Sequence, residues 1–515
     1  MSHSAQAAGG SNVSRALARD RLGVPAVAFF VLSATTPMTV VAGVVTTGYA
    51  VTGVTGLPFA FVIIAAILML FSVGYVAMSR HITNAGAFYT YIARGLGRPA
   101  GVGAAWAALV AYNALQVGLY GIIGAAAAPR LQDWFDINPS WWVVALVAWA
   151  IVALTGLLGV DVNGRILAVL LLAEIAILLI FGFADLANPA GGDLTFDTLS
   201  PANLFESGVG AILALAILGF IGFETAVVYS EESRNPKRTV AIATYMSILV
   251  VAVVYTLSSW AMSVATGPDN IVAFAGENGP GTIFVLAGEH LGNTWVEIGE
   301  TLFVTSLLAA MISFHNTCAR YGFAIGRERV LPGALGQTSL STGAPMIASI
   351  IQSVIGLAVI IWYAAADLDP VVQLFFYWGT GGAFGVLLLL TATSLAVIAF
   401  FARRPSGETV WRRLIAPALA AIALGIVVGL ALDNFDTLLG VAPNNNLRWI
   451  IPAIFPIVFL LGVLWALFLR ANSPEVYSTI GLGAHSVTGL DVIEETPSSF
   501  ARRDDQATTG DGKYW

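Results

Sequence analysis

The chain has 515 residues and little charge: only 10% of them are Asp, Glu, Lys or Arg. Soluble domains carry about 25%, so this chain cannot coat the surfaces of the several soluble domains that its length would otherwise suggest. It has a single cysteine, Cys318, which excludes an intramolecular disulfide and a cysteine-based metal site. The sequence has no Walker A motif, no HExxH and no complete GxGxxG. We therefore expect no ATP site and no cofactor.

Apolar sequence fills the chain instead. Hydrophobic residues make up 57% of it, and they come in continuous blocks of about 20, the length that crosses a bilayer as a helix. The strands of a membrane β-barrel would alternate instead. The polar start lacks an apolar h-region, so we expect no cleavable signal peptide. We predict an all-α membrane protein with twelve transmembrane helices, at residues 26–52, 56–79, 99–128, 141–159, 166–185, 207–231, 240–265, 296–322, 346–365, 371–401, 414–432 and 449–470.

These spans divide the chain into four parts. Residues 1–24 form a polar N-terminal tail, residues 25–401 a core of ten helices, and residues 402–471 two extra helices. The C-terminal tail, 472–515, is rich in Asp, Thr, Ser and Gly, a composition that predicts disorder.

The positive charges predict the orientation. With twelve spans, only Arg130 and Arg448 of the 23 basic residues fall in loops opposite the termini, which leaves 21 on the side of the tails. Basic loops stay on the cytoplasmic side during insertion, so we expect both termini in the cytoplasm and the chain in the cytoplasmic (inner) membrane. The basic residues lie in short loops against the lipid bilayer, so nucleic acid is not expected as a partner.

Two spans are interrupted at matching positions. The first contains Pro37 and Gly43 at mid-membrane, and the sixth contains Gly219, Gly222 and Glu224. Proline removes a backbone donor and breaks helical geometry, although such residues can also merely kink a transmembrane helix. Interruptions at corresponding positions of two halves indicate a transporter site. We predict a 5+5 inverted repeat, with helices 1 and 6 unwound and two extra helices after it.

Unwound helices offer both signs of partial charge. Half-helix N-termini attract an anion, and freed carbonyl groups attract a cation. A small zwitterion satisfies both, so we predict an amino acid ligand, with its carboxylate at the amides of Ala42 and Gly43 and its ammonium at the carbonyls of Phe220 and Ile221. Helix 3 contributes polar side chains that either line the pocket or bridge helices. The predicted substrate-binding residues are Thr36, Met38, Thr39, Ala42, Gly43, Asn113, Gln116, Phe220, Ile221, Gly222 and Glu224.

Ionisable residues inside apolar spans are the candidates for ion coupling, because a charge at the bilayer centre costs at least about 2.5–3.5 kcal/mol. We predict that Glu174, Glu224 and His315 carry protons. Structural hydrogen bonds for the carboxylates, and simple packing for the histidine, are the alternatives. Protons are favoured over sodium, for which Ser313 and Thr317 would be the ligands.

Aromatic residues near these positions are candidates for gates. We predict gating roles for Tyr112, Phe223 and Trp378. For Trp378, which lies in an aromatic run in helix 10, packing against lipid is the alternative.

Three separated motifs resemble the amino acid–polyamine–organocation (APC) superfamily of permeases, of the bacterial amino acid permease type. Phe220–Glu224 with the following Ser230–Arg238 is similar to that family's sixth helix and its acidic loop. Asn84–Gly97 resembles its loop between helices 2 and 3, and Arg320–Pro332 resembles its segment after helix 8. The sequence differs from many members at Thr36–Thr39, where they carry Gly-Ser-Gly. It also has Leu218 where exchangers for arginine-like substrates carry Trp.

The resemblance implies the inverted-repeat fold shared with the bacterial leucine transporter, and secondary active transport by alternating access. Some proton-coupled relatives place a Lys in the part of helix 5 where this chain has Glu174. We predict a proton-coupled importer of amino acids. An importer of polyamines or small amines, and an amino acid exchanger, are alternatives of the same fold. A membrane enzyme would need a converging catalytic set, which the sequence lacks. A channel would conduct far faster than a carrier, and a nutrient sensor would bind without uptake.

Overall fold

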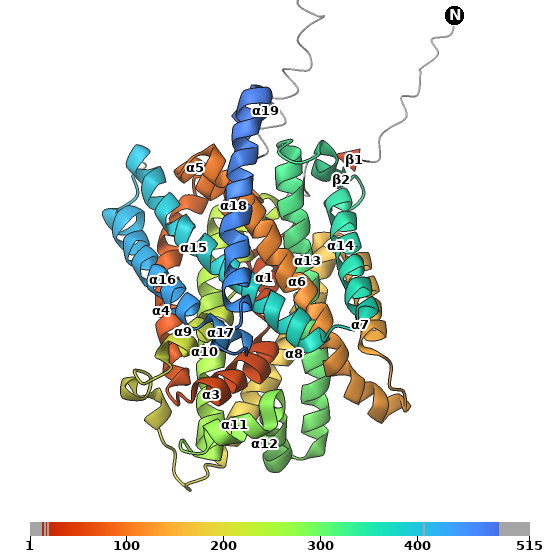
Figure 1. Cartoon of the computed structure of the whole chain (residues 1–515), viewed down its shortest axis with the longest axis vertical. Coiled ribbons are helices and arrows are strands. Elements are labelled where there is room, and N and C mark those ends of the chain that lie inside the picture. The colour runs from red at the N-terminus through yellow and green to blue at the C-terminus, as the bar shows by residue number, and fades with distance from the viewer. Residues whose placement is uncertain (1–12, 15–16, 18–19, 405–406, 484–515) are drawn as a thin grey trace, which may run out of the picture.

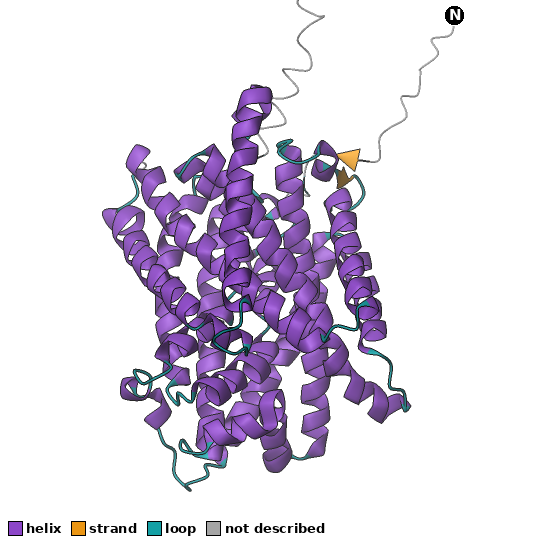
Figure 2. Cartoon of the chain, in the orientation of Figure 1, coloured by secondary structure: helices purple, strands orange, loops and turns teal. Residues whose placement is uncertain are grey.

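The structure is a computed structural model that describes residues 13–14, 17, 20–404 and 407–483. Nearly all of the described residues are helical, and the helices run side by side in one bundle (Figure 2). Most of the predicted N-terminal tail and most of the predicted C-terminal tail lie outside the described residues.

Eleven helices within these ranges are long and apolar enough to cross a membrane. They agree closely with eleven of the twelve predicted spans. The corresponding elements are α1 (Val24–Thr35) continued by α2 (Pro37–Thr39), η1 (Val40–Val45) and α3 (Thr46–Thr52); α4 (Leu57–Ser79); α6 (Arg98–Phe135); α8 (Val160–Ala187); α9 (Val209–Leu218) with η4 (Phe223–Glu232); α10 (Pro236–Thr266); α13 (Asn293–Arg327); α14 (Met346–Ala365); η7 (Pro370–Phe376) with α15 (Tyr377–Arg403); η8 (Trp411–Ile415) with α16 (Ala416–Asp433); and α18 (Leu447–Asn472).

The segment predicted as the fourth span is shorter than the others. It forms α7 (Trp141–Gly156), an apolar helix of 16 residues, whereas about 20 residues span the hydrocarbon core without help. The connections contain further short elements: α5 (Ala87–Gly95), η2 (Asp197–Leu199), η3 (Pro201–Asn203), α11 (Ile271–Asn278), η5 (Gly279–Gly281), α12 (Thr282–Leu291), η6 (Gly333–Gly336), α17 (Phe435–Leu439) and α19 (Pro474–Thr479).

The bundle has a buried centre and an apolar outer surface. α6 packs against α13, α15 and α18, and α10 packs against α1, α4 and α8. On the outside, large apolar side chains such as Val169, Leu172, Ile422 and Ile426 are exposed. A soluble protein avoids so extended an apolar surface, and in a bilayer it faces the lipid tails.

Both described ends of the chain lie at the same edge of the bundle, which we call the tail side. β1 (Val13–Ser14) pairs antiparallel with β2 (Thr338–Ser339) there, and α19 lies at the same edge (Figure 1). α11, α12 and α17 lie toward the opposite edge (Figure 1).

The first part of the C-terminal tail is ordered, contrary to the predicted disorder of all of 472–515. α19 is followed by a loop in which the amides of Gly481 and Gly483 donate to the Glu328 carboxylate at 2.7 and 2.6 Å. Arg94 of α5 donates to the carbonyl of Gly481 at 2.8 Å, and Tyr89 of α5 donates to Glu328. Burial raises the pKa of Glu328, against these hydrogen bonds. Composition missed this because a few backbone contacts fix the loop, not a large apolar core.

Candidate functional site

Helix 1 is interrupted at Thr36. This residue has φ 45° and ψ 64°, between the end of α1 and the start of α2. Pro37 explains the position, because proline lacks an N–H and disfavours helical geometry in the residue before it. The chain then stays helical through η1 and α3. Ala42 and Gly43 therefore lie beyond the break, within η1. The amides predicted to hold a carboxylate are nearly two helical turns away from the unwound residue.

Helix 6 is interrupted between α9 and η4. The chain turns at Gly219–Gly222, and Gly222 has a φ of +121°, which side-chain-bearing residues rarely adopt. A Cβ at Gly222 would lie 2.8 Å from the carbonyl carbon of Ala34. Glycine thus lets the backbone of helix 6 touch helix 1 next to its break.

A tyrosine joins the two breaks. The hydroxyl of Tyr255, from α10, lies 2.8 Å from the carbonyl oxygen of Thr35 and 2.9 Å from that of Gly219. Both interrupted helices are held at one point by the same side chain.

A cavity of about 150 Å³ lies beside the breaks. Its walls come from both interrupted helices, from α6, α13, η7 and α15, and from the short helix α17. The lining residues are Ala34, Thr35, Thr36, Thr39, Val40, Gly43, Val44, Thr47, Leu115, Leu119, Leu215, Leu218, Ile221, Phe314, Phe375, Phe376, Gly379, Thr380, Ala383 and Leu438. The hydroxyl oxygen of Thr39 is buried there and has no hydrogen-bond partner among the described residues.

The predicted binding residues divide into two groups. Thr36, Thr39, Gly43 and Ile221 line this central cavity. The others are elsewhere in the buried centre or on a different surface: Met38, Ala42, Phe220, Gly222 and Glu224 are buried beside the breaks, Gln116 donates to Tyr120 at 3.3 Å, and Asn113 lines a second cavity.

That second cavity, of about 210 Å³, is apolar and lies between α6, α14 and α15. Trp378, predicted as a gate, lines it beside Asn113 and donates to the hydroxyl of Tyr363 at 2.8 Å. Trp378 is thus directed away from the central cavity.

Glu174 lies behind the break in helix 1. Its carboxylate accepts hydrogen bonds from the Met38 amide, an amide that the break frees, and from the hydroxyl of Ser306 in α13 at 2.8 Å. One side chain of helix 5 therefore links the break in helix 1 to α13.

Glu224 lies just after the break in helix 6, on the side of the break that faces the tail side. It accepts from the hydroxyl of Tyr112 at 2.7 Å and from the amide of Gly222 at 2.9 Å. Phe223 packs edge-on against Phe71, with ring centroids 5.9 Å apart. Two of the three predicted gating residues, Tyr112 and Phe223, thus lie next to the buried carboxylate of Glu224.

His315 and the candidate sodium ligands have other partners. His315 lies 2.8 Å from the hydroxyl of Ser349 in α14. Ser313 donates to the carbonyl of Phe30 at 2.8 Å, and Thr317 donates to the carbonyl of Ser313 at 3.0 Å. Both hydroxyls therefore donate their proton to backbone carbonyl groups.

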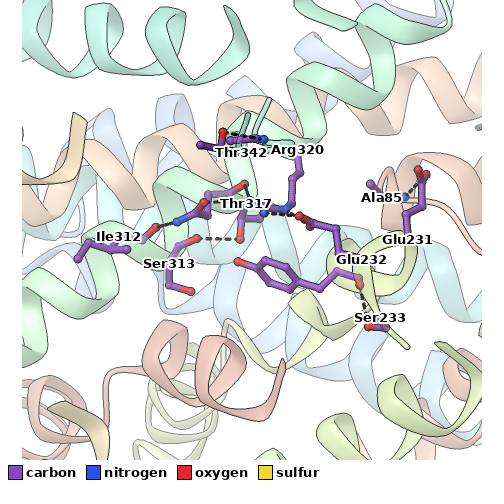
Figure 3. A network of polar contacts seen from close by, with 12 residues as sticks. Ala85, Glu231, Glu232, Ser233, Ile312, Ser313, Thr317, Arg320 and Thr342 are labelled. Carbon is purple, nitrogen blue, oxygen red and sulfur yellow. Dashed lines mark hydrogen bonds and ion pairs between the residues drawn. The ribbon is translucent and has the colours of Figure 1, made fainter. Parts of the chain in front are cut away.

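A network of charged residues lies between the break in helix 6 and the tail side. Arg320 of α13 binds Glu232 with two bonds, of 2.6 and 3.0 Å, and both side chains are almost fully buried (Figure 3). Arg327 binds Glu231 at 2.7 and 2.8 Å. The amide of Ala85 donates to Glu231 at 3.0 Å (Figure 3). These bonds join α13 to the end of η4 and to the loop before α5.

The two ion pairs and part of the cavity wall were not predicted from the sequence. The signal for the pairs was present, since Arg320 lies near the end of the predicted span 296–322 and Glu231–Glu232 follow the second break. For Phe314, Thr380 and Leu438 no sequence signal exists, because apolar and small residues at the cavity resemble ordinary packing residues.

The fold and the cavity define a multi-pass membrane transport protein. The chain belongs to the amino acid permease family, whose model matches residues 22–482. Like its relatives, it is a permease and not an enzyme.

Curated relatives cover much of the chain. The branched-chain amino acid permease BcaP of Bacillus subtilis (strain 168) is 23% identical over 453 residues, which is 82% of this chain and 88% of that protein. The low-affinity putrescine importer PlaP of Escherichia coli (strain K12) is 23% identical over 386 residues, covering 71% and 78%. The aromatic amino acid transport protein AroP of the same strain is 24% identical over 330 residues, covering 61% and 65%.

Proposed function

We propose that this permease is a secondary active transporter that imports amino acids by alternating access. The observation that carries the proposal is the meeting of two interrupted helices at one cavity. A helical segment that begins at Pro37 presents its positive end near the cavity. The break in helix 6 adds backbone carbonyl groups, so a carboxylate and an ammonium group both find partners.

The breaks also support a 5+5 inverted repeat, in which helices 1 and 6 correspond. The count then includes α7 as a twelfth span, with both tails in the cytoplasm of a bacterium and the chain in its inner membrane. The basic residues of the tail side support that orientation.

The described conformation supports alternating access with the tail side closed. The cavity receives Leu438 from α17, away from the tail side, whereas the buried pair Arg320–Glu232 lies between the cavity and the tails. Import requires these contacts to part while the opposite end closes.

We further propose that Glu174 couples transport to protons. Its carboxylate bridges the freed amide of Met38 and Ser306 of α13, so its charge acts on two helices whose relative position must change. Glu224 is the second candidate, through its bond to Tyr112. The imidazole of His315 contacts the Ser349 hydroxyl of the neighbouring helix α14, which favours a packing role.

The test is uptake into proteoliposomes with an imposed inward pH gradient, screened across radiolabelled amino acids and amines. We expect accumulation that collapses when a protonophore dissipates the gradient. Uptake that needs sodium and ignores the pH gradient would refute proton coupling. No uptake of any amino acid or amine, by protein that is folded and correctly inserted, would refute the transport proposal itself.

Glu174→Gln tests the coupling residue. The amide keeps an oxygen for the Met38 and Ser306 donors, so the fold is expected to persist while the titrating group is lost. Uptake should no longer respond to the pH gradient, whereas exchange of internal for external substrate should continue. A variant that still accumulates substrate with the wild-type pH dependence would remove Glu174 from the mechanism. His315→Gln is the matched control, for which gradient-driven uptake is expected to remain.

A further inference from the structure

The central cavity has no charged side chain in its lining, as far as the described residues define it. The polar side chains there are five threonines, Thr35, Thr36, Thr39, Thr47 and Thr380. Three of these five belong to the segment around the break in helix 1, where a zwitterion is proposed to bind.

The two nearby carboxylates are engaged elsewhere. Glu174 binds the amide of Met38, a residue that does not line the cavity. Glu224 is held by Tyr112 and by its own turn at Gly222. A positively charged substrate side chain would therefore lose its hydration in the cavity without gaining a negatively charged partner.

The remaining wall is apolar. Its large side chains include four leucines from α6 and α9 and the aromatic rings of Phe314, Phe375 and Phe376. Such a surface stabilises an apolar side chain in proportion to the area that it covers, and it offers nothing to a second ammonium or carboxylate.

We infer that the cavity selects amino acids with uncharged, apolar side chains and rejects basic amino acids and polyamines. This inference rests on the proposed function, since it names the substrate class of the same site. It separates this chain from the amine alternative, although one of its relatives is named a putrescine importer.

Gly379 sets the size limit of the apolar part. It lines the cavity at the start of α15, and a Cβ placed on it meets no atom within 4 Å. A larger residue at this position would fill cavity space without displacing a neighbour of the glycine. Its helical backbone accepts such a residue, because its φ is not in the left-handed range.

The experiment measures ligand binding to the purified full-length permease by thermal stabilisation and by isothermal titration. The probes are L-leucine, L-phenylalanine, L-alanine, L-lysine and putrescine. The variant Gly379→Leu is compared with Gly425→Leu, a matched control on the exposed face of α16, where an added Cβ also meets nothing within 4 Å.

We expect lysine and putrescine to bind on the order of a hundredfold more weakly than leucine, which corresponds to the cost of an uncompensated charge in an apolar site. Gly379→Leu should weaken leucine and phenylalanine binding by about tenfold or more and alanine binding much less. Gly425→Leu should bind as the wild type does.

Three results would overturn the inference. Lysine or putrescine binding as tightly as leucine would refute the apolar selectivity and leave the transport proposal standing. Equal loss of alanine and phenylalanine binding in Gly379→Leu would refute the role of Gly379. Failure of all five probes to bind, together with failure of the uptake screen, would refute the proposed function and this inference with it.

Discussion

Thr39 is the clearest single-residue link between the fold and ligand binding. Its hydroxyl is buried at the cavity and has no partner. An unpaired buried hydroxyl costs about 1–3 kcal/mol, so Thr39→Val, which keeps the shape, should leave the melting temperature unchanged or raise it. If the hydroxyl binds substrate, the same change should weaken leucine binding by about fivefold to tenfold, measured by isothermal titration.

Thr46→Val is the control for that prediction. Thr46 lies on the same helix and is equally buried, but its hydroxyl donates to the carbonyl of Ala42. Its replacement should leave leucine affinity unchanged. Weaker binding in Thr46→Val, with wild-type binding in Thr39→Val, would show that the effect comes from the helix and not from a substrate contact.

Which residues would matter could be predicted only in part. The sequence predicts that Glu174 has polar partners, because a carboxylate in an apolar span must find them, and the Met38 amide and the Ser306 hydroxyl are these partners. Asn113 was predicted to bind substrate and Trp378 to act as a gate, yet both line the second cavity. Successive residues of a helix point about 100° apart around its axis. In a helix that is buried on nearly all sides, no polar pattern marks the face that meets the substrate.

At the scale of elements, the interrupted helices were predictable in position to within a few residues. Pro37 fixes the break in helix 1 at the residue before it, Thr36. Gly43, predicted to share the break, instead lies in continuing helix. The sequence could not separate these roles, because a glycine is compatible with both a break and an intact helix.

The two glycines should therefore respond differently to alanine. Gly222→Ala places a Cβ against Ala34 at a φ of +121° and is expected to lower the free energy of unfolding by about 1–3 kcal/mol or more. Gly43→Ala meets nothing within 4 Å and should be neutral or slightly stabilising. Thermal denaturation in detergent measures both. A larger loss for Gly43→Ala than for Gly222→Ala would contradict the described break.

The C-terminal loop gives a second test at this scale. Gly483 has a φ of +62°, and a Cβ there would lie 2.5 Å from the side-chain nitrogen of Asn84. Gly483→Leu should therefore release the loop from Glu328, and amide hydrogen exchange in a peptide covering residues 474–483 should become faster by about tenfold or more. Gly429→Leu, on the exposed face of α16, should leave that peptide unchanged. Unchanged exchange in Gly483→Leu would contradict the docking.

At the scale of the molecule, composition and hydropathy predicted most of the architecture. Long apolar runs fix where helices cross a bilayer, and eleven described helices match the predicted spans. The closure of the tail side could not be predicted. It depends on which arginine meets which glutamate across α13 and η4, and pairs that are distant in sequence leave no local pattern.

Cys318 can report on that closure. It is the only cysteine in the chain, it is buried, and it lies one helical turn from the cavity residue Phe314 toward the tail side of α13. Arg327→Ala removes both bonds from the buried Arg327 to Glu231, whose side chain is 11% exposed; breaking a fully buried pair costs about 3–5 kcal/mol in other proteins. The closed tail side should lose population to an open one, and N-ethylmaleimide should alkylate Cys318 about tenfold faster or more.

The control for this alkylation measurement is a variant that breaks an ion pair without opening the tail side. Arg412 pairs with Glu408 at 3.2 Å on the tail side, and its side chain is 45% exposed, so that pair contributes little. In Arg412→Ala, Cys318 should be alkylated at the wild-type rate. In Arg327→Lys it should be alkylated at an intermediate rate, because the positive charge is retained. All rates are compared well below each variant's melting temperature, so that exposure by global unfolding does not contribute. If Arg327→Ala protects Cys318 as well as the wild type does, the buried pairs hold the fold together but do not gate the tail side.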